Sequence, residues 1–345
     1  MYVVPRITYV VMAHSRERQL LRLVRVLRRE SPNSSVVIHW DRQAPPLDAA
    51  PFLELGNVFL VEHPVHPEWG GFQVVAALLA SMRTAMAVTR FDWIVFLSGQ
   101  DYPITPLEQT EAELAASGCD SFLDAGTIAS GRMAFRWRRS GDTRLGRRYY
   151  FGYVALPAIG RRLPRRLRGA MLRCAFLVDE SQPFVSLWPM PAGVRWRLGV
   201  RRLRTPFGPG RPCRVGSMWL SLSRRGAERV LDRAGDATRL VRHYRRTIIA
   251  DESFFQTVVC ADPKLTTAPD NGRYEIWEDS DSPLHPVTLT VDRLEQILSS
   301  GKHFARKFDE QLDSEVLDRI DEHRRALAVI DRERTESHGA EQLAS

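Results

Sequence analysis

The acidic residue best placed for proton chemistry is Glu252, in the run ADESFFQT at 250–257. Asp251 is predicted to cap a helix whose first turn holds Glu252 and whose apolar residues at 254, 255 and 258 pack inward. A glutamate there can protrude toward a cleft and act as general base on a hydroxyl group. From local sequence alone, the commoner explanation is an acid favoured by the helix dipole, so both interpretations stay open.

A second possible chemistry is the binding of phosphate charge by cations that alternate with aromatic residues. Lys307 lies in the run FARKFD at 304–309, and Arg273 lies upstream in GRY at 272–274. Lysine binds phosphate as a point charge, and arginine binds it as a planar fork. A solvated basic patch would give the same pattern. Only three of the 49 basic residues are lysines, however, and one of them is kept at position 307.

Several further residues with polar or aromatic side chains follow short apolar runs. In sheets covered on both faces, ligands bind beyond the carboxyl ends of the strands. Asp41 directly follows one such run, where a carboxylate can accept hydrogen bonds from a ribose or a base, and a turn aspartate is the equal alternative. Asp101 stands alone before a proline turn, without the second acid expected of a divalent-metal site. The candidate positions of this group are His14, Asp41, Trp69, Ser98 and Asp101.

Other chemistries find little support in the sequence. It contains no HExxH, GxSxG or P-loop motif and no GxGxxG after a strand. The four cysteines have no CxxC spacing, which argues against a zinc site and a disulfide framework. The net charge of +8 suits an anionic partner such as a nucleotide or acidic lipid. The arginine cluster at 136–148 matches no recognised nucleic-acid module, so no nucleic-acid partner is expected.

These residues must be positioned by the alternating strand and helix patterns of the first half of the chain. Strand-like and helical patterns that alternate in this way predict an α/β fold with a mostly parallel central sheet flanked by helices. No apolar run reaches the roughly 20 residues of a membrane helix, and the first one is read as a strand and not a signal peptide. The predicted strands are 7–13, 35–39, 57–61 and a run from Trp93, and the predicted helices are 18–29 and 72–88.

The middle and the second half of the chain differ from the first part in composition and periodicity. Arginine, proline, glycine and aromatic residues dominate between 131 and 214, which predicts a loop-rich insertion with short helices such as 161–176. Pattern then returns, with strand-like runs at 216–223, near Leu265 and at 274–277, and helices at 294–300 and 314–329. The organisation predicted from these patterns is one domain over 1–330, made of parts 7–125, 131–215 and 216–330, with a polar, frayed tail at 331–345.

Taken in this order, the segments resemble the core-2/I-branching enzyme family, glycosyltransferase family 14, which also includes the peptide O-xylosyltransferases. Each segment alone is a weak signal, and their order and spacing from about residue 7 to about residue 320 make the resemblance specific. The matching segments are ITYVVMAH at 7–14, VVIHWD at 36–41, the helix entry at Trp69, FLSGQDYPI at 96–104, GSMWLSLS at 216–223, ADESFFQT at 250–257, GRYEIW at 272–277, SPLHP at 282–286 and FARKFD at 304–309.

The resemblance implies a GT-A type fold and inverting transfer of a sugar from a UDP-sugar, with no metal ion or other cofactor. By position, Glu252 matches the catalytic base, and Arg273 and Lys307 match the basic pair that neutralises the UDP diphosphate. Asp41 matches the acid at the uridine end of the donor site. The remaining positions expected to line the uridine or sugar are His14, Trp69, Ser98 and Asp101.

The expected partners follow from the same resemblance. The donor would carry N-acetylglucosamine or xylose, and the acceptor would be a glycan, glycolipid or peptide hydroxyl. Animal members have a Golgi membrane anchor, a stem and several disulfides. This shorter, arginine-rich sequence instead suggests a bacterial enzyme in the cytoplasm, with peripheral association at the inner face of the membrane. The alternative is an inactive glycan- or nucleotide-binding protein on the same fold, which an absence of UDP binding would favour.

Overall fold

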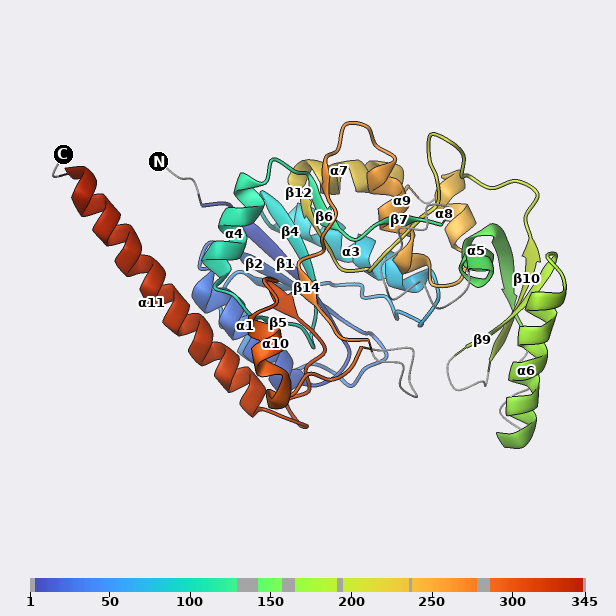
Figure 1. Cartoon of the computed structure of the whole chain (residues 1–345), viewed down its shortest axis with the longest axis horizontal. Helices are drawn as coiled ribbons and strands as arrows, with labels where there is room; N and C mark the ends of the chain where they lie inside the picture. The colour runs from blue at the N-terminus through green and yellow to red at the C-terminus, as the bar shows by residue number, and fades with distance from the viewer. Residues whose placement is uncertain are drawn as a thin grey trace.

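The structure is a computed structural model of the chain, and it describes residues 4–128, 142–156, 165–190, 195–235, 238–277 and 286–343. Residues 282–285 of the SPLHP segment and residues 136–141 of the arginine cluster lie outside the described residues. Figure 1 shows a central sheet with helices on both faces, and a smaller module at one end of the molecule.

The central sheet has seven strands in the order β13-β6-β12-β4-β1-β2-β3. Four neighbouring pairs are parallel, whereas β12 runs antiparallel to both β4 and β6. This confirms the predicted α/β fold with a mostly parallel sheet. The strands are β1 (Ile7–Ala13), β2 (Ser35–Trp40), β3 (Val58–Leu60), β4 (Trp93–Ser98), β6 (Ser121–Leu123), β12 (Leu220–Ser223) and β13 (Thr267–Ala268).

Two apolar cores lie on opposite faces of this sheet. Successive side chains of a strand point to opposite faces, and in β4 Ile94 and Phe96 enter one core while Val95 and Leu97 enter the other. The first core is covered by α3 (Gln73–Val88), α7 (Arg224–Arg233), α8 (Arg239–Tyr244) and α9 (Phe254–Cys260). The second is covered by α1 (Glu17–Glu30), α2 (Ala50–Leu53), α4 (Leu107–Ala116), α10 (Leu294–Leu298) and α11 (Glu315–Leu343).

A small three-stranded sheet joins three segments that are distant in the sequence. β14 (Arg273–Tyr274) pairs in parallel with β15 (Phe304–Ala305), which pairs antiparallel with β5 (Tyr102–Pro103). The strand predicted at 274–277 is therefore shorter and begins one residue earlier. A two-stranded ribbon of β7 (Gly126–Thr127) and β11 (Arg214–Val215) is in contact with α9 through β11.

The arginine-rich middle of the chain contains more β structure than its pattern predicts. We use the term arginine-rich module for its described residues 142–156, 165–190 and 195–203. Its strands form a sheet in the order β8-β10-β9, and its long helix corresponds to the one predicted at 161–176. Its elements are α5 (Asp142–Tyr150), β8 (Phe151–Ala155), α6 (Arg165–Ser181), β9 (Val185–Pro189) and β10 (Trp196–Arg201).

Two more sequence expectations differ from the structure. The run 216–223 becomes a strand only from Leu220, because the Gly216 N–H donates to the Glu252 carbonyl (2.9 Å) outside the sheet. The helix predicted at 314–329 continues through the expected polar tail to Leu343, as α11 in Figure 1. Among the helices of the described residues, none is long and apolar enough to cross a membrane.

Candidate active site

The ends of β1, β2 and β4 meet at one edge of the central sheet. Because these strands are parallel neighbours, the residues that follow them lie side by side. The Asp41 N–H donates to the carbonyl of Ala13, and the Gly99 N–H donates to that of Met12, both at 2.9 Å. The structure therefore brings His14, Asp41 and Ser98 to the same edge, with the His14 side chain exposed.

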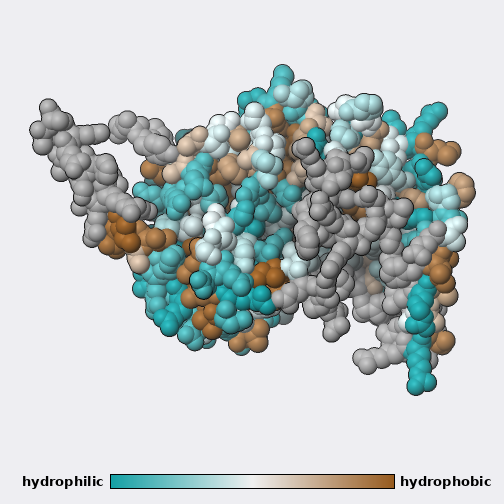
Figure 2. All heavy atoms as spheres, in the orientation of Figure 1, coloured by the Kyte–Doolittle hydropathy of each residue, from teal (hydrophilic) through white to brown (hydrophobic). Residues whose placement is uncertain are grey.

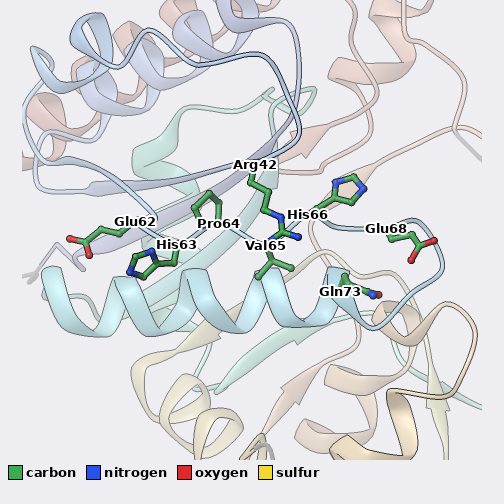
Figure 3. A pocket seen from close by; sticks show the side chains of 8 residues that line it. All are labelled: Arg42, Glu62, His63, Pro64, Val65, His66, Glu68 and Gln73. Atoms are coloured by element: carbon green, nitrogen blue, oxygen red, sulfur yellow. The ribbon is translucent and has the colours of Figure 1, made fainter.

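Asp41 is a buried carboxylate that holds the loop after β3. It lies 2.9 Å from Nδ1 of His66, and it accepts a hydrogen bond from the Gln43 N–H at 2.9 Å. The hydrogen bond from Gln43 is the kind that a turn aspartate makes, which was the alternative interpretation of Asp41. A cavity of about 530 Å³ opens beside His66, which is large enough for a small ligand. Figure 3 shows its lining, which includes Arg42, Val65 and Gln73.

Asp101 is a second buried carboxylate, and both of its oxygens are engaged. Its Oδ2 accepts from the Ser98 N–H at 3.1 Å, and its Oδ1 accepts from Nε of Arg306 at 3.0 Å. Asp101 is only 1% exposed. The acid that lacks an acidic neighbour in the sequence thus has an arginine as its charge partner.

Arg306 is a cation of this site that the sequence interpretation did not select. In the run FARKFD, the sequence pattern pointed to its neighbour Lys307 instead. Its guanidinium carbon lies 4.6 Å from the centre of the Trp219 ring, and its Nη1 lies 3.6 Å from a carboxylate oxygen of Glu275. The two phenylalanines of the run, Phe304 and Phe308, gave no signal that Arg306 turns toward Asp101.

Lys307 is the cation with the fewest contacts in this group. Its half-buried ammonium forms no hydrogen bond or ion pair with any residue in the described part of the chain. Burial lowers the pKa of Lys307, and the positive charges of Arg306 and Arg16 lower it further. A crowded cation without a partner is suited to binding an anionic group.

Arg273 lies deeper than a direct phosphate ligand would be expected to lie. It is 5% exposed, its Nη2 donates to the Phe96 carbonyl at 2.7 Å, and its guanidinium stacks on Phe304 at 4.9 Å. Burial lowers the pKa of Arg273 to about 10, partly offset by the negative charge of Asp101. In this structure Arg273 lies beneath the site, close enough to Asp101 to act on its charge, and its predicted contact with a diphosphate stays a prediction.

Glu252 lies outside the helix whose first turn was predicted to hold it. It ends a short 3-10 turn (Ala250–Glu252), and α9 begins only at Phe254. Its Oε2 lies 3.1 Å from Nη1 of Arg148, whose guanidinium lies 5.2 Å from the Trp188 ring centre. Glu252 therefore does not lie in the first turn of α9, where a helix-dipole acid would lie, and it is paired with Arg148.

The Glu252 turn is tied to the loop that carries Trp69. The Ile249 N–H donates to the Gly70 carbonyl at 2.9 Å, and the Ile249 carbonyl accepts from the Tyr149 hydroxyl at 3.1 Å. Trp69 packs with Ile249 in a small apolar cluster that also receives Trp188. Gly70 has a φ of +69°, which an L side chain rarely adopts. Trp69 and Glu252 are therefore brought together.

The segment 216–219 links Glu252 to the cation Arg306. Gly216 is hydrogen-bonded to the Glu252 carbonyl, and Trp219, three residues later, lies under Arg306. Three residues span at most roughly 11 Å. The site therefore consists of a carboxylate with two tryptophans on one side of this segment and of Arg306, Lys307 and Asp101 on the other.

The chain matches the sequence model of the core-2/I-branching enzyme family over residues 7–148 and 205–299. It is 25% identical over 339 residues to Xylosyltransferase 1 of Homo sapiens, covering 92% of this chain and 30% of that protein. It is 23% identical over 330 residues to Beta-glucuronosyltransferase GlcAT14B of Arabidopsis thaliana, covering 92% of this chain and 65% of that protein. The chain thus spans about a third of the first relative and just under two thirds of the second.

A comparison with solved structures gives a distant resemblance. Glucosyl-3-phosphoglycerate synthase from Mycobacterium tuberculosis, in complex with Mn²⁺, UDP-glucose and phosphoglyceric acid, is 17% identical, with a TM-score of 0.28. The alignment covers 41% of this chain and 49% of that one.

Proposed function

The chain belongs to the core-2/I-branching enzyme family, and from this premise we propose that it is an inverting, metal-independent glycosyltransferase. It transfers a sugar from a UDP-sugar to an acceptor hydroxyl. The observation that carries this proposal is that Glu252, paired with Arg148, and the cations Arg306 and Lys307 lie on two sides of one short segment.

Inversion at the sugar requires a base on the face opposite the leaving group. We assign this role to Glu252, whose carboxylate takes the proton of the acceptor hydroxyl as that oxygen attacks the sugar. Trp69 and Trp188 pack beside the Glu252 turn. Aromatic rings of this kind offer flat apolar surfaces, and we propose that the acceptor approaches over them.

The leaving UDP develops negative charge on its diphosphate as the bond to the sugar breaks. Preorganised cations at that position lower the energy of the transition state. Lys307 has no ion pair within the described residues and is available for this role. Arg306 is already paired with Asp101 at 3.0 Å, so it would share its charge between that carboxylate and the diphosphate.

The hydrogen bonds of Asp101 support the proposed metal independence. Its two oxygens bond an arginine and a backbone N–H, so this carboxylate supplies no free oxygen to a cation in the structure. At the uridine end, Asp41 and the cavity beside His66 fit a base and ribose. His14 and Ser98, at the strand ends between these two places, are assigned to the same donor site.

The donor and acceptor are proposed only by class. N-acetylglucosamine and xylose are the sugars expected from the family, and the name of the plant relative adds glucuronic acid. The acceptor would be a glycan, glycolipid or peptide hydroxyl, and the setting proposed is the bacterial cytoplasm.

A panel of UDP-sugars, with UDP release as the readout, tests this function directly. Each donor is offered with and without EDTA and with a mixture of simple acceptor sugars. We expect one donor to be turned over equally well in both conditions. Strong dependence on added Mn²⁺ would reject the metal-free mechanism, and a complete absence of UDP binding would favour an inactive binding protein.

A further inference from the structure

A groove of about 610 Å³ between the arginine-rich module and α8 is lined by arginine and apolar residues. Among the residues that the structure describes, none that lines this groove is acidic. The arginines come from the end of β10 and from α8 with the turn after it, so the groove forms only when these two segments are folded together. They are Arg201, Arg202, Arg242, Arg245 and Arg246.

Most of this positive charge is not neutralised by the described residues. Arg201, Arg242 and Arg246 are exposed, and their side chains form no hydrogen bond or ion pair with any residue that the structure describes. Burial and the nearby positive charge of Arg246 lower the pKa of Arg202. Like charges held this close repel one another, so an anionic partner in the groove would be attracted by all of them.

Exposed apolar side chains surround the same arginines. Val154 and Val200 line the groove and are 59% and 55% exposed, respectively. Leu203 is fully exposed, and Phe184 is 67% exposed beside Arg201, whose N–H donates to the Phe184 carbonyl at 2.9 Å. Such side chains on a monomer surface commonly mark a binding face.

Helix α6 continues this mixture of charge and apolar surface. Arg166 and Arg173 are exposed, as are Leu167 and Leu177 at 51% and 63%. Figure 2 shows hydrophobic and hydrophilic residues alternating along the edge of the molecule where α6 lies. Arginines interleaved with leucine and phenylalanine are typical of protein surfaces that rest on an acidic bilayer.

We propose that the arginine-rich module, together with the arginines of α8 and the turn after it, docks on a membrane surface that carries acidic phospholipids. The guanidinium groups bind headgroup phosphates, and Val154, Phe184, Val200 and Leu203 enter the interfacial layer. The exposed apolar tips favour a bilayer over an acidic glycan, because a soluble polyanion gives them nothing apolar to contact. Arg201 and Arg202 lie between the two stretches that match the family, and the other three groove arginines lie within the second stretch. None of the five has a role in the proposed sugar transfer, so the docking can fail without affecting that proposal.

Docking in this way would bring the proposed acceptor side close to the bilayer. Arg246 and Glu252 are six residues apart, a stretch that spans at most roughly 22 Å. A membrane-linked acceptor could therefore reach Glu252 without leaving the surface.

Vesicle sedimentation with the full chain tests the proposal. We expect binding to vesicles that are roughly one-third phosphatidylglycerol, no binding to pure phosphatidylcholine, and weakening as NaCl is raised. The triple variant Arg201→Gln, Arg242→Gln, Arg246→Gln should bind about tenfold or more weakly. Leu203→Asn should weaken the binding that remains at high salt. Thermal unfolding confirms that each variant is folded.

A matched variant separates docking by this groove from general attraction of a basic chain. Arg25→Gln, Arg83→Gln, Arg90→Gln removes the same charge from exposed positions on the central domain, and we expect it to bind nearly as well as the wild type. Equal losses in the two triple variants, or no binding to acidic vesicles, would overturn the proposal. Binding to a soluble polyuronate through the groove arginines, without vesicle binding, would also overturn it and assign the groove to an acidic glycan.

Discussion

The ion pair between Glu252 and Arg148 joins residues 104 positions apart in the sequence. Arg148 lies against Trp188 and fixes one carboxylate oxygen of Glu252 at 3.1 Å. A base held in this way keeps its orientation before the acceptor arrives, which limits the reorganisation needed during proton transfer. Arg148 is therefore a positioning residue in the proposed mechanism.

Replacing Lys307 with alanine tests the proposed contact with the diphosphate. Because the ammonium has no ion pair with residues in the described ranges, its loss should leave the fold intact. A charge-assisted hydrogen bond contributes about 1.5–3 kcal/mol, so UDP should bind about ten- to a hundredfold more weakly by isothermal titration calorimetry.

Lys302→Ala is the matched control for that measurement. Lys302 is paired with Asp270 at 2.5 Å, away from the strand ends, and its removal should leave UDP affinity unchanged. If Lys307→Ala bound UDP as tightly as the control does, Lys307 would have no part in the donor site.

At the same scale, the roles of the two nearby arginines were hard to predict. Arg273 precedes Tyr274, and Arg306 lies two residues from both Phe304 and Phe308, so both arginines have aromatic residues nearby in the sequence. That pattern does not separate their roles. Only the pairing of β14 and β15 shows that Arg273 points under the sheet edge while Arg306 reaches Asp101. Strand pairing between distant segments leaves no trace in local periodicity, so the choice between the two cations was not available from the sequence.

Among the elements, the turn before α9 does the most to shape the site. Ile249 has a φ of 53°, a left-handed conformation that is costly for a β-branched residue. Its N–H and carbonyl are both bonded, to Gly70 and Tyr149 respectively. These contacts over-determine the turn and hold Glu252 clear of the helix that follows.

The packing of α4 on β1 gives a prediction about stability and pH. Glu111 is buried against Tyr9 and accepts a hydrogen bond from the Ser31 hydroxyl. Burial raises the pKa of Glu111 to about 7, from 4.5. Because the folded state favours the protonated form, this group stabilises the fold fully below pH 4.5, and that contribution is lost as pH rises through 7.

Glu111→Gln should remove this dependence. We expect the wild type to lose up to about 3 kcal/mol of unfolding free energy between pH 4.5 and 8 through this residue, and the variant to lose far less. Urea unfolding at the two pH values measures the difference. Glu228→Gln, on the exposed surface of α7, is the control, and a wild-type-like pH profile in Glu111→Gln would contradict the assignment.

At the scale of the whole molecule, a buried charge adds to the apolar packing that holds α11 on the central domain. Arg324 is 1% exposed, pairs with Glu30 of α1 and Asp321, and lies 5.5 Å from the Tyr102 ring centre. Removing one partner of a buried ion pair commonly costs about 3–5 kcal/mol. We expect Arg324→Ala to lower the thermal midpoint by several degrees in calorimetry.

Arg325→Ala is the control, because its side chain is exposed on the same helix. It should change stability by less than about 0.5 kcal/mol. Equal effects of the two substitutions would mean that Arg324 contributes only through helix propensity.

Much of the fold of the whole chain could be predicted from the sequence, because apolar runs such as β1, β2 and β4 are buried on both faces and leave a clear signal. The arginine-rich module could not. In β10 the apolar residues Trp196, Leu198 and Val200 do alternate with arginine or glycine, but Val200 is exposed. The sheet is stabilised from outside by packing on Ile248 and Ile249. Helix α11 was also predicted too short, because its last turns lack the apolar spacing that marks a buried face.

The central claim is that Glu252 is the base of a sugar transferase, and one comparison tests it most directly. Donor binding and sugar transfer are measured side by side for the wild type, Glu252→Gln and the exposed-site control Glu54→Gln. We predict that Glu252→Gln binds UDP as the wild type does but transfers sugar about 10²- to 10⁴-fold more slowly, while the control is unchanged. Transfer by Glu252→Gln at the rate of the wild type would contradict the account.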